Sequence, residues 1–456
     1  MARVRHLAAG ARRERDSGEV GTARAATAMR SRAAAWRYFE QVVAVGTVFL
    51  VGLRQDLHNG VTSGSAMAVL LLPVSVPVLR QFRGARLVVG VGILTTIWGY
   101  ILSRYARFSN VVIPSLTNSS VALLLGIVVS VMVILWARTV ISVPAIGIAY
   151  SIGMALGATV FRLNHVNPWK FSYGLPCAIL FLSLSRVRSG KGSTRRAVVE
   201  IGILFLLAVV SAAFDSRSYA ATFVLAALLL LWQLRSGKGG FRRSPLMTLG
   251  LMSCIGVTVY YLGTTLLVDG YLGAQAQART ISQIEMSGSV IVGGRPELQA
   301  TLALFAHRPM GFGFGVRASP NEILVAKQGL GSIHYAPNNG YVDRYMFGDQ
   351  IELHSVVGDL WAGAGIMGIV FALVLAGTIL FNMASRISER RATGLILLLG
   401  LWNLWNLLFS PILSSSSTLI LAVGLILYHK ASEDRRVDSS GGVPAMRSRR
   451  TAKVES

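Results

Sequence analysis

The sequence predicts an all-α fold: a polytopic membrane helix bundle of about twelve spans, with a long, partly helical external loop between spans nine and ten. Three observations support this prediction. With 456 residues, 53% of them apolar and only 14% charged, the chain has too little polar surface for a soluble protein of several domains. Apolar stretches of about 16 to 23 residues recur along it, close to the roughly 20 that a helix needs to cross a bilayer. Strongly basic loops alternate with less basic ones, which is the positive-inside pattern.

Each predicted span is one of these apolar runs. In chain order they are 38–53, 62–79, 87–103, 117–137, 139–160, 171–185, 197–214, 218–234, 246–268, 357–381, 392–409 and 413–429. The division into domains follows: a basic cytoplasmic tail over 1–37, the bundle over 38–429, including an external loop over 269–356, and a polar, disordered cytoplasmic tail over 430–456.

The formal charge of +24 is mainly an orientation signal. The basic residues gather in three short loops that contain no acidic residue: Arg80, Arg83 and Arg86; Arg186, Arg188, Lys191, Arg195 and Arg196; Arg235, Lys238, Arg242 and Arg243. With twelve spans and both termini inside, all three loops lie on the cytoplasmic side. This distribution argues against a nucleic-acid partner and indicates a protein embedded in membrane lipid.

The external loop contains most of the one long polar interval in the chain. A structureless loop of this length is improbable, so we expect helices within it. Pro296 suits a first helical turn, and Leu298, Leu302 and Phe305 recur at helical spacing before Pro309. This pattern predicts an amphipathic helix over 296–307 on the outer membrane surface. The glycines of 311–315 then allow a flexible segment of close approach.

Arg217 is the first candidate for a functional charge. It belongs to the very tight turn Asp215-Ser216-Arg217 between two spans, so it must lie at or just below the outer interface. A charge at membrane depth costs roughly 2.5 to 3.5 kcal/mol on insertion scales. One reading is a local pair with Asp215 or a side chain that snorkels to the headgroups, and the other is an anion site facing a cavity.

Two further arginines and one histidine lie in or beside the external loop. Arg308, in the last turn of the predicted helix, is explained by the helix dipole. Arg295 follows two glycines at the other end, where free backbone N–H groups and a guanidinium suit a phosphate or diphosphate. His354 lies just before the tenth span, among Asp349, Glu352 and Asp359. A lone histidine is more often structural, but a neighbouring carboxylate can make it a base near neutral pH.

The chain has no metal-binding or nucleotide-binding motif, so the sequence predicts no metal site and no cofactor.

Several short motifs, in this order, resemble the O-antigen ligase and O-antigen polymerase superfamily of bacterial envelope enzymes. They are Asp215-Ser216-Arg217, then Gly294-Arg295-Pro296-Glu297-Leu298 with His307-Arg308-Pro309-Met310-Gly311-Phe312-Gly313-Phe314-Gly315, then Glu352-Leu353-His354-Ser355 with Asp359-Leu360 and Gly363-Ala364-Gly365-Ile366-Met367-Gly368. This chain differs from the usual pattern in having Gln299 where an aromatic residue commonly follows, and Ser355 where asparagine often follows the histidine.

The resemblance implies a glycosyltransferase of the bacterial cytoplasmic membrane, acting at its outer face. Such an enzyme transfers a glycan from an undecaprenyl diphosphate carrier to an acceptor hydroxyl on a glycan or lipid. By this resemblance Arg217 and Arg295 bind the diphosphate and His354 activates the acceptor, with Asp215, Glu297, Arg308, Asp349 and Glu352 as candidate supporting residues. Because the donor already contains a good leaving group, we expect a single inverting displacement that needs no metal.

Two alternatives remain open. Within the superfamily, the acceptor distinguishes a ligase from a polymerase, and the sequence does not separate them. From another class, a transporter or flippase of lipid-linked saccharides would also suit twelve spans and a cationic cavity. That reading predicts charges deep in several spans and matching broken helices in the two halves, whereas the charges here cluster at the outer face.

Overall fold

The computed structural model describes residues 32–161, 163–188, 193–235, 244–271 and 273–430. Most of the predicted tails 1–37 and 430–456 lie outside the described residues, as do parts of the basic loops, at 189–192 and 236–243. The described chain is almost entirely helical, which confirms an all-α membrane protein of the multi-pass type. A helix over 32–53 begins six residues before the first predicted span.

Seven helices of the described part are long and apolar enough to cross a membrane. They are α4 (Ala85–Ala106), α5 (Pro114–Val140), α6 (Val143–Phe161), α8 (Ser193–Ala213), α9 (Arg217–Arg235), α10 (Pro245–Val268) and α15 (Val356–Ser388). In the same described part, α16 (Gly394–Phe409) and α17 (Ile412–Ile426) are apolar but shorter, and α7 (Gly174–Arg188) is a further helix of 15 residues. The described residues therefore contain seven candidate spans by length and hydropathy, and the predicted twelve remains a prediction.

The second predicted span, 62–79, is not one straight helix. It consists of α2 (Ser63–Leu70) and α3 (Leu72–Val78), with a 3₁₀ turn η1 (Leu79–Gln81), and the two parts are bent by 76°. Pro73 in the first turn of α3 explains the break, because proline cannot continue the hydrogen bonding of a preceding helix. If the bent pair is one span, the count of candidate spans rises to eight.

A short β-hairpin precedes α2. Strands β1 (Asp56–His58) and β2 (Val61–Thr62) are antiparallel. Asn59 and Gly60 between them have φ of 48° and 79°, the left-handed conformation that tight hairpin turns require.

The main core lies where the apolar helices pack together. Helix α8 packs on α9, α15 on α4, α6 on α7, and α17 on α5, around buried leucine, isoleucine, valine and alanine side chains. Helix α10 is the exception, since only 6% of its most apolar window is buried. It therefore lies at the periphery of the bundle, with apolar residues such as Val257, Leu262 and Leu266 exposed.

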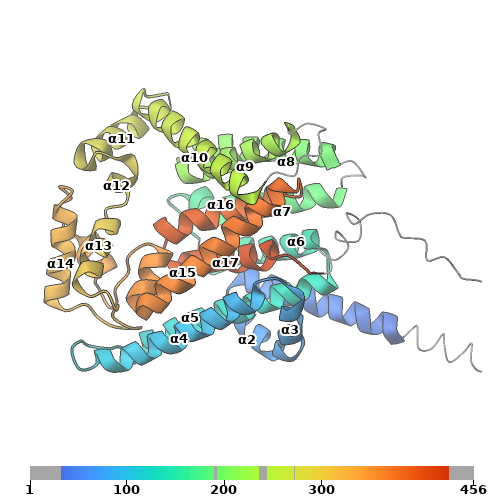
Figure 1. Cartoon of the computed structure of the whole chain (residues 1–456), viewed down its shortest axis with the longest axis horizontal. Helices are drawn as coiled ribbons and strands as arrows, with labels where there is room; N and C mark the ends of the chain where they lie inside the picture. The colour runs from blue at the N-terminus through green and yellow to red at the C-terminus, as the bar shows by residue number, and fades with distance from the viewer. Residues whose placement is uncertain (1–31, 162, 189–192, 236–243, 272, 431–456) are drawn as a thin grey trace, which may run out of the picture.

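The interval between α10 and α15 is largely helical, as expected for the long loop. Figure 1 shows its helices gathered at one end of the bundle, at the left of the view. They are α11 (Ala274–Ser287), α12 (Val290–Gly294), α13 (Glu297–His307), α14 (Pro320–Gly331) and the π-helix η3 (Tyr341–Met346). Helix α13 coincides with the predicted helix 296–307. A second core beneath these elements includes Leu304, Phe312, Leu330, Met346 and Trp361, so the interval has tertiary structure of its own.

The glycines of 311–315 fix this interval to the bundle by close approach. Gly311 has φ of 77°, and a Cβ there would lie 2.5 Å from the carbonyl oxygen of Trp361. Gly365, in the first third of α15, has φ of 57° and kinks that helix at the same contact. The backbone N–H of Phe312 donates to the carbonyl of Ala362 (2.8 Å). Only glycine fits where two backbones approach this closely with positive φ.

Helix α15 holds α17 at both ends. At one end the Asp359 carboxylate accepts from the backbone N–H of Ile412 (2.9 Å), at the start of α17. At the other end the Arg386 guanidinium donates to the carbonyl of Ile426 (2.9 Å), and Arg138 of α5 donates to the carbonyl of Gly424 (2.7 Å). These side chains satisfy backbone groups that a helix leaves without partners at its ends.

Candidate functional site

The corner between α8 and α9 places Arg217 against the long interval. Its guanidinium contacts the Asp215 carboxylate (3.4 Å) and donates from Nη1 to the Thr280 hydroxyl of α11 (3.1 Å). Asp215 has φ of 49°, a left-handed conformation that aspartate tolerates better than most residues. The local pair with Asp215, one of the two readings of Arg217, is therefore present, and the same side chain also reaches an element some 60 positions further along the chain.

Two cations that the sequence did not single out join Arg217 at this corner. Arg279 of α11 pairs with the other oxygen of Asp215 (3.2 Å). Lys170, in the π-helical turn η2 (Trp169–Tyr173) before α7, lies within electrostatic reach of Asp215, Arg217, Arg279 and Arg295. Burial lowers the pKa of Lys170. Asp215 raises this pKa, whereas the three arginines lower it further. Arg217 and Arg279 share the Asp215 carboxylate, and Lys170 and Arg295 add further positive charge, so the corner has an excess of positive charge that favours an anionic ligand.

Arg295 lies between the short helix α12 and α13. The first turn of α13 is occupied by the buried carboxylate of Glu297, so the helix dipole already has an anionic neighbour there. A phosphate beside Arg295 would therefore contact mainly the guanidinium. The backbone N–H groups of α13 would contribute less than the sequence suggested.

His354 stands in a strained backbone conformation directly before α15. Its φ is 54°, which is uncommon for a residue with a side chain. The flanking residues are held firmly: the Leu353 N–H donates to the Asp359 carboxylate (3.0 Å), and the Ser355 hydroxyl caps α15 by accepting from the Gly358 N–H (2.9 Å). Ser355 thus performs the capping role that asparagine can also fill. These contacts hold His354 in its strained backbone conformation. Strained residues of this kind are concentrated at functional sites.

The imidazole of His354 packs among aromatic and charged side chains of η3 and α13. The ring of Tyr345 lies 5.4 Å away between centroids, and that of Tyr341 lies 6.4 Å away. Burial lowers the pKa of His354, the Glu297 carboxylate opposes this effect, and Arg295 adds to it. The imidazole is therefore neutral near pH 7, the form that can accept a proton.

Glu297 is the acid that the structure brings to His354. One of its oxygens accepts a hydrogen bond from the Tyr341 hydroxyl. Burial and this carboxylate raise the pKa of Tyr341, so its hydroxyl stays protonated and remains a donor. Tyr341 therefore fixes the position of Glu297.

Three polar atoms of this site are buried and have no hydrogen-bond partner among the described residues: Arg217 Nη2, Glu297 Oε2 and His354 Nδ1. Buried polar atoms are normally satisfied, and the exceptions call for an explanation such as an absent ligand or a catalytic role. These atoms belong to one of the two arginines predicted to bind the diphosphate, to the predicted base His354 and to its neighbour Glu297.

The other predicted supporting residues have structural partners. Arg308 pairs with Glu322 of α14 (3.1 Å), donates to Asn110 (3.0 Å) and lies over the ring of Phe312 (5.1 Å), so it links α13 to α14 and to the turn before α5. These contacts explain Arg308 better than the helix dipole does. Asp349 pairs with Arg317 on the surface (2.9 Å).

Glu352 lies nearer to the site than Asp349 does. It accepts from the Gln350 amide (2.8 Å), and its charge contributes to raising the pKa of Tyr345. No hydrogen bond joins it to His354 in the described structure.

Lys170, Arg279, Tyr341 and Tyr345 are the members of the site that the sequence analysis missed. In the sequence Arg279 and Lys170 look like ordinary charges at the end of a span or on a surface helix. The turn signal Asn338-Asn339-Gly340 was the one indication near the tyrosines, because it announces a new element directly before Tyr341.

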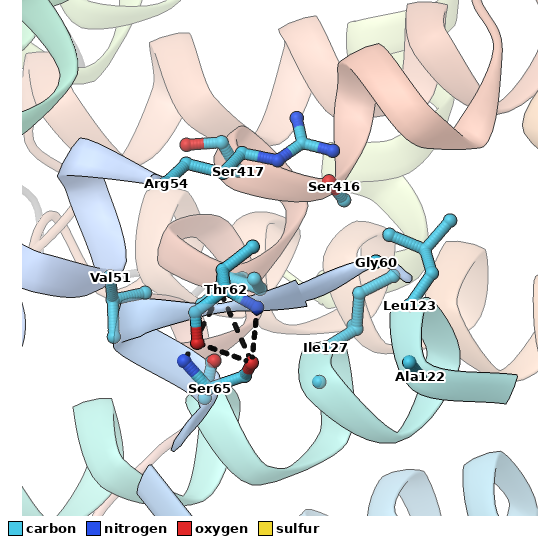
Figure 2. Close-up of a pocket in the computed structure, with 13 residues that line it drawn as sticks. Val51, Arg54, Gly60, Thr62, Ser65, Ala122, Leu123, Ile127, Ser416 and Ser417 are labelled. Atoms are coloured by element: carbon cyan, nitrogen blue, oxygen red, sulfur yellow. Dashed lines mark hydrogen bonds between the residues drawn. The ribbon is translucent and has the colours of Figure 1, made fainter. Parts of the chain in front are cut away.

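A small pocket lies in another part of the bundle. Figure 2 shows it between the helix over 32–53, the β-hairpin, α5 and α17, with Arg54, Thr62, Ser65, Ser416 and Ser417 among its lining residues. There the Thr62 hydroxyl accepts from the Ser65 backbone N–H and the Ser65 hydroxyl accepts from the Thr62 backbone N–H, which together form the capping box of α2. None of the predicted site residues lines this pocket, so it offers no support for a second reading of the function.

Comparison with known proteins adds no relative: no protein-family model, no curated protein and no solved structure matches the chain. The functional argument therefore depends on the residues and geometry of this chain.

Proposed function

We propose that this protein is a membrane glycosyltransferase that moves a glycan from an undecaprenyl diphosphate carrier to an acceptor hydroxyl at the outer face of the bacterial cytoplasmic membrane. One observation carries the proposal. A cluster of four cations, Lys170, Arg217, Arg279 and Arg295, meets a partly buried histidine at one end of a membrane helix bundle. The cations suit a diphosphate, and the histidine suits the activation of an alcohol.

In the proposed mechanism the chain supplies charge and one base. The imidazole of His354, whose buried Nδ1 has no hydrogen-bond partner among the described residues, takes the proton of the acceptor hydroxyl. The acceptor oxygen then forms a bond to the anomeric carbon while the bond from that carbon to the diphosphate oxygen breaks. The leaving undecaprenyl diphosphate carries away the electron pair, and the arginine cluster stabilises its developing negative charge. One displacement of this kind inverts the anomeric configuration and leaves no covalent intermediate on the enzyme.

Glu297 acts through His354. Its carboxylate favours the protonated imidazole that forms during the step, and Tyr341 keeps that carboxylate in place. Glu297 is thus a positioning residue of the proposed reaction, and it does not touch the acceptor.

The proposal includes the topology. Twelve spans with both termini in the cytoplasm place the basic loops inside and the interval from α11 to η3 outside. The α8–α9 corner, η2 and the start of α15 then lie on the same outer face. In this arrangement α7, α16, α17, the bent α2–α3 pair and the helix over 32–53 complete the twelve.

Purified full-length protein and a lipid-linked repeat unit test the activity. We expect longer lipid-linked chains if the protein is a polymerase, and transfer only after a separate acceptor is added if it is a ligase. Arg217→Ala, Arg295→Ala and His354→Ala should each abolish transfer, and cells with these variants should accumulate the lipid-linked precursor. Normal glycan in cells with all three variants, a trapped glycosyl-enzyme or retained configuration would refute the mechanism. Translocation of the lipid-linked saccharide across vesicles without any transfer would instead indicate the flippase.

A further inference from the structure

The π-helix η3 presents two stacked tyrosines beside His354. Tyr341 and Tyr345 are four positions apart, with ring centroids 5.2 Å apart and planes inclined by 13°. The adjoining side of η3 is formed by Val342 and Met346, which are fully buried in the second core. π-Helical turns often occur at functional sites, because the wider turn redirects side chains that an α-helix would place elsewhere.

The tyrosine pair is held in place before any ligand binds. The Tyr341 hydroxyl donates to Glu297, the Asn339 side chain accepts from the Val342 N–H (3.0 Å), and Asp343 of η3 pairs with Lys327 of α14 (2.7 Å). A rigid surface loses little conformational entropy on binding, so it binds more tightly than a mobile one.

Tyr345 nevertheless remains 39% exposed, although its ring lies 5.4 Å from that of His354. Its surroundings are charged: Glu352, Asp359, Glu297 and Arg295 all act on it electrostatically, and burial with the three carboxylates raises the pKa of its hydroxyl to about 12. A lipid chain over this ring would bring hydrocarbon against charged groups, which is unfavourable. A sugar ring fits better, since its C–H face is apolar and its rim carries hydroxyls for the charged groups around the tyrosine.

We propose that Tyr345 is the platform on which a sugar ring of the acceptor stacks, and that the acceptor is therefore a saccharide whose reactive hydroxyl points at His354. This inference deepens the proposed function and rests on it. It assigns the open side of the site to the acceptor and the cationic cluster to the donor, with His354 between them.

The test compares Tyr345→Ala with Tyr345→Phe and with Tyr105→Ala, an exposed tyrosine of α4 that serves as the control. In the transfer assay we expect Tyr345→Ala to raise the KM for the acceptor about 10-fold, the size of a good aromatic contact, and to leave the KM for the donor unchanged. Tyr345→Phe keeps the ring and should stay within about 3-fold of wild type, as should Tyr105→Ala. An unchanged acceptor KM in Tyr345→Ala, or an equal loss in Tyr345→Phe, would overturn the platform.

A binding measurement separates this inference from the proposed activity. The probe is the free oligosaccharide released by mild acid from the lipid-linked repeat, observed by saturation-transfer NMR with the full-length protein. We expect a signal with wild type that is lost in Tyr345→Ala and kept in Tyr105→Ala. If that pattern appears but no transfer occurs, the platform stands and the transferase proposal fails. A signal that survives in Tyr345→Ala, no signal with wild type, or full competition by a plain alkyl chain would refute the platform.

Discussion

His354 is subject to opposing influences on its pKa. Burial and Arg295 favour the neutral imidazole, while Glu297 favours the protonated one. In the proposed reaction His354 is the general base, and the Glu297 carboxylate limits how far burial and Arg295 lower its pKa. The residue therefore depends on two side chains from the junction of α12 and α13, about 60 positions earlier in the sequence.

Replacing Glu297 by glutamine should shift the pH dependence of transfer in a defined direction. Removal of the carboxylate lowers the pKa of His354, so the imidazole stays neutral to lower pH and the acidic limb of the pH–rate profile moves down. The plateau rate also falls, because the base is weaker. The measurement is kcat/KM against pH for Glu297→Gln, with Glu285→Gln, an exposed acid of α11, as control. A limb that moves up, or an equal shift in the control, would contradict the role of Glu297.

His354→Ala should remove transfer and keep donor binding. Loss of a positioned general base costs about 10²- to 10⁴-fold in rate, whereas the cation cluster that would hold the diphosphate is untouched by this change. The rate and the donor Kd are measured on the same detergent preparation. A donor Kd weakened as much as the rate would show that His354 acts in binding or folding.

At the scale of the element, the decisive contact is the one between Gly311 and the kink of α15 at Gly365. It ties the long interval to the helix that follows His354. A Cβ at Gly365 would lie 2.1 Å from the Met310 carbonyl oxygen, so the two backbones would have to separate. Since His354 lies eleven residues before Gly365, the contact also determines the direction of the first turns of α15, directly after His354.

Gly365→Ala should therefore destabilise the fold and weaken activity together. We expect a loss of about 1 to 3 kcal/mol from the positive φ, with the steric contact adding to it. Gly377→Ala, in the same helix, is the matched control, because nothing lies within 4 Å of a Cβ there and alanine is the better helix former. Thermal unfolding in detergent compares the two variants. Equal melting temperatures would show that the contact at Gly365 is not as tight as described.

At the scale of the whole molecule, the proposed topology is open to a labelling test. The native Cys177 and Cys254 are first replaced by serine. A cysteine at Asn321, exposed on α14, should react with a membrane-impermeant maleimide in intact cells. A cysteine at Arg86, in the first turn of α4, should react only after the membrane is permeabilised. Labelling of Arg86→Cys in intact cells would overturn both the twelve-span topology and the outer position of the site.

The sequence was sufficient for the features that depend on composition and local pattern. Apolar length and basic loops predicted a helical membrane protein, and the Pro296 signal located α13. The bend between α2 and α3 was missed. The apolar length of 62–79 suggested one straight span, although Pro73 and Pro77 lie within it. The partners of the site could not be predicted, because Lys170, Arg279 and Tyr345 reach it only through packing between elements far apart in the chain. A local sequence pattern indicates the secondary structure and the chemistry available to a residue. Which residues come together in the site is determined by tertiary contacts.

The contacts of α15 with both ends of α17 affect the orientation that α17 can adopt. A helix carries partial positive charge at its start and partial negative charge at its end. Asp359 meets the start of α17, and Arg386 meets its end. An inverted α17 would set carbonyl oxygens against a carboxylate and N–H groups against a guanidinium, which is repulsive at both places. The two contacts therefore fix the direction in which α17 packs against α15.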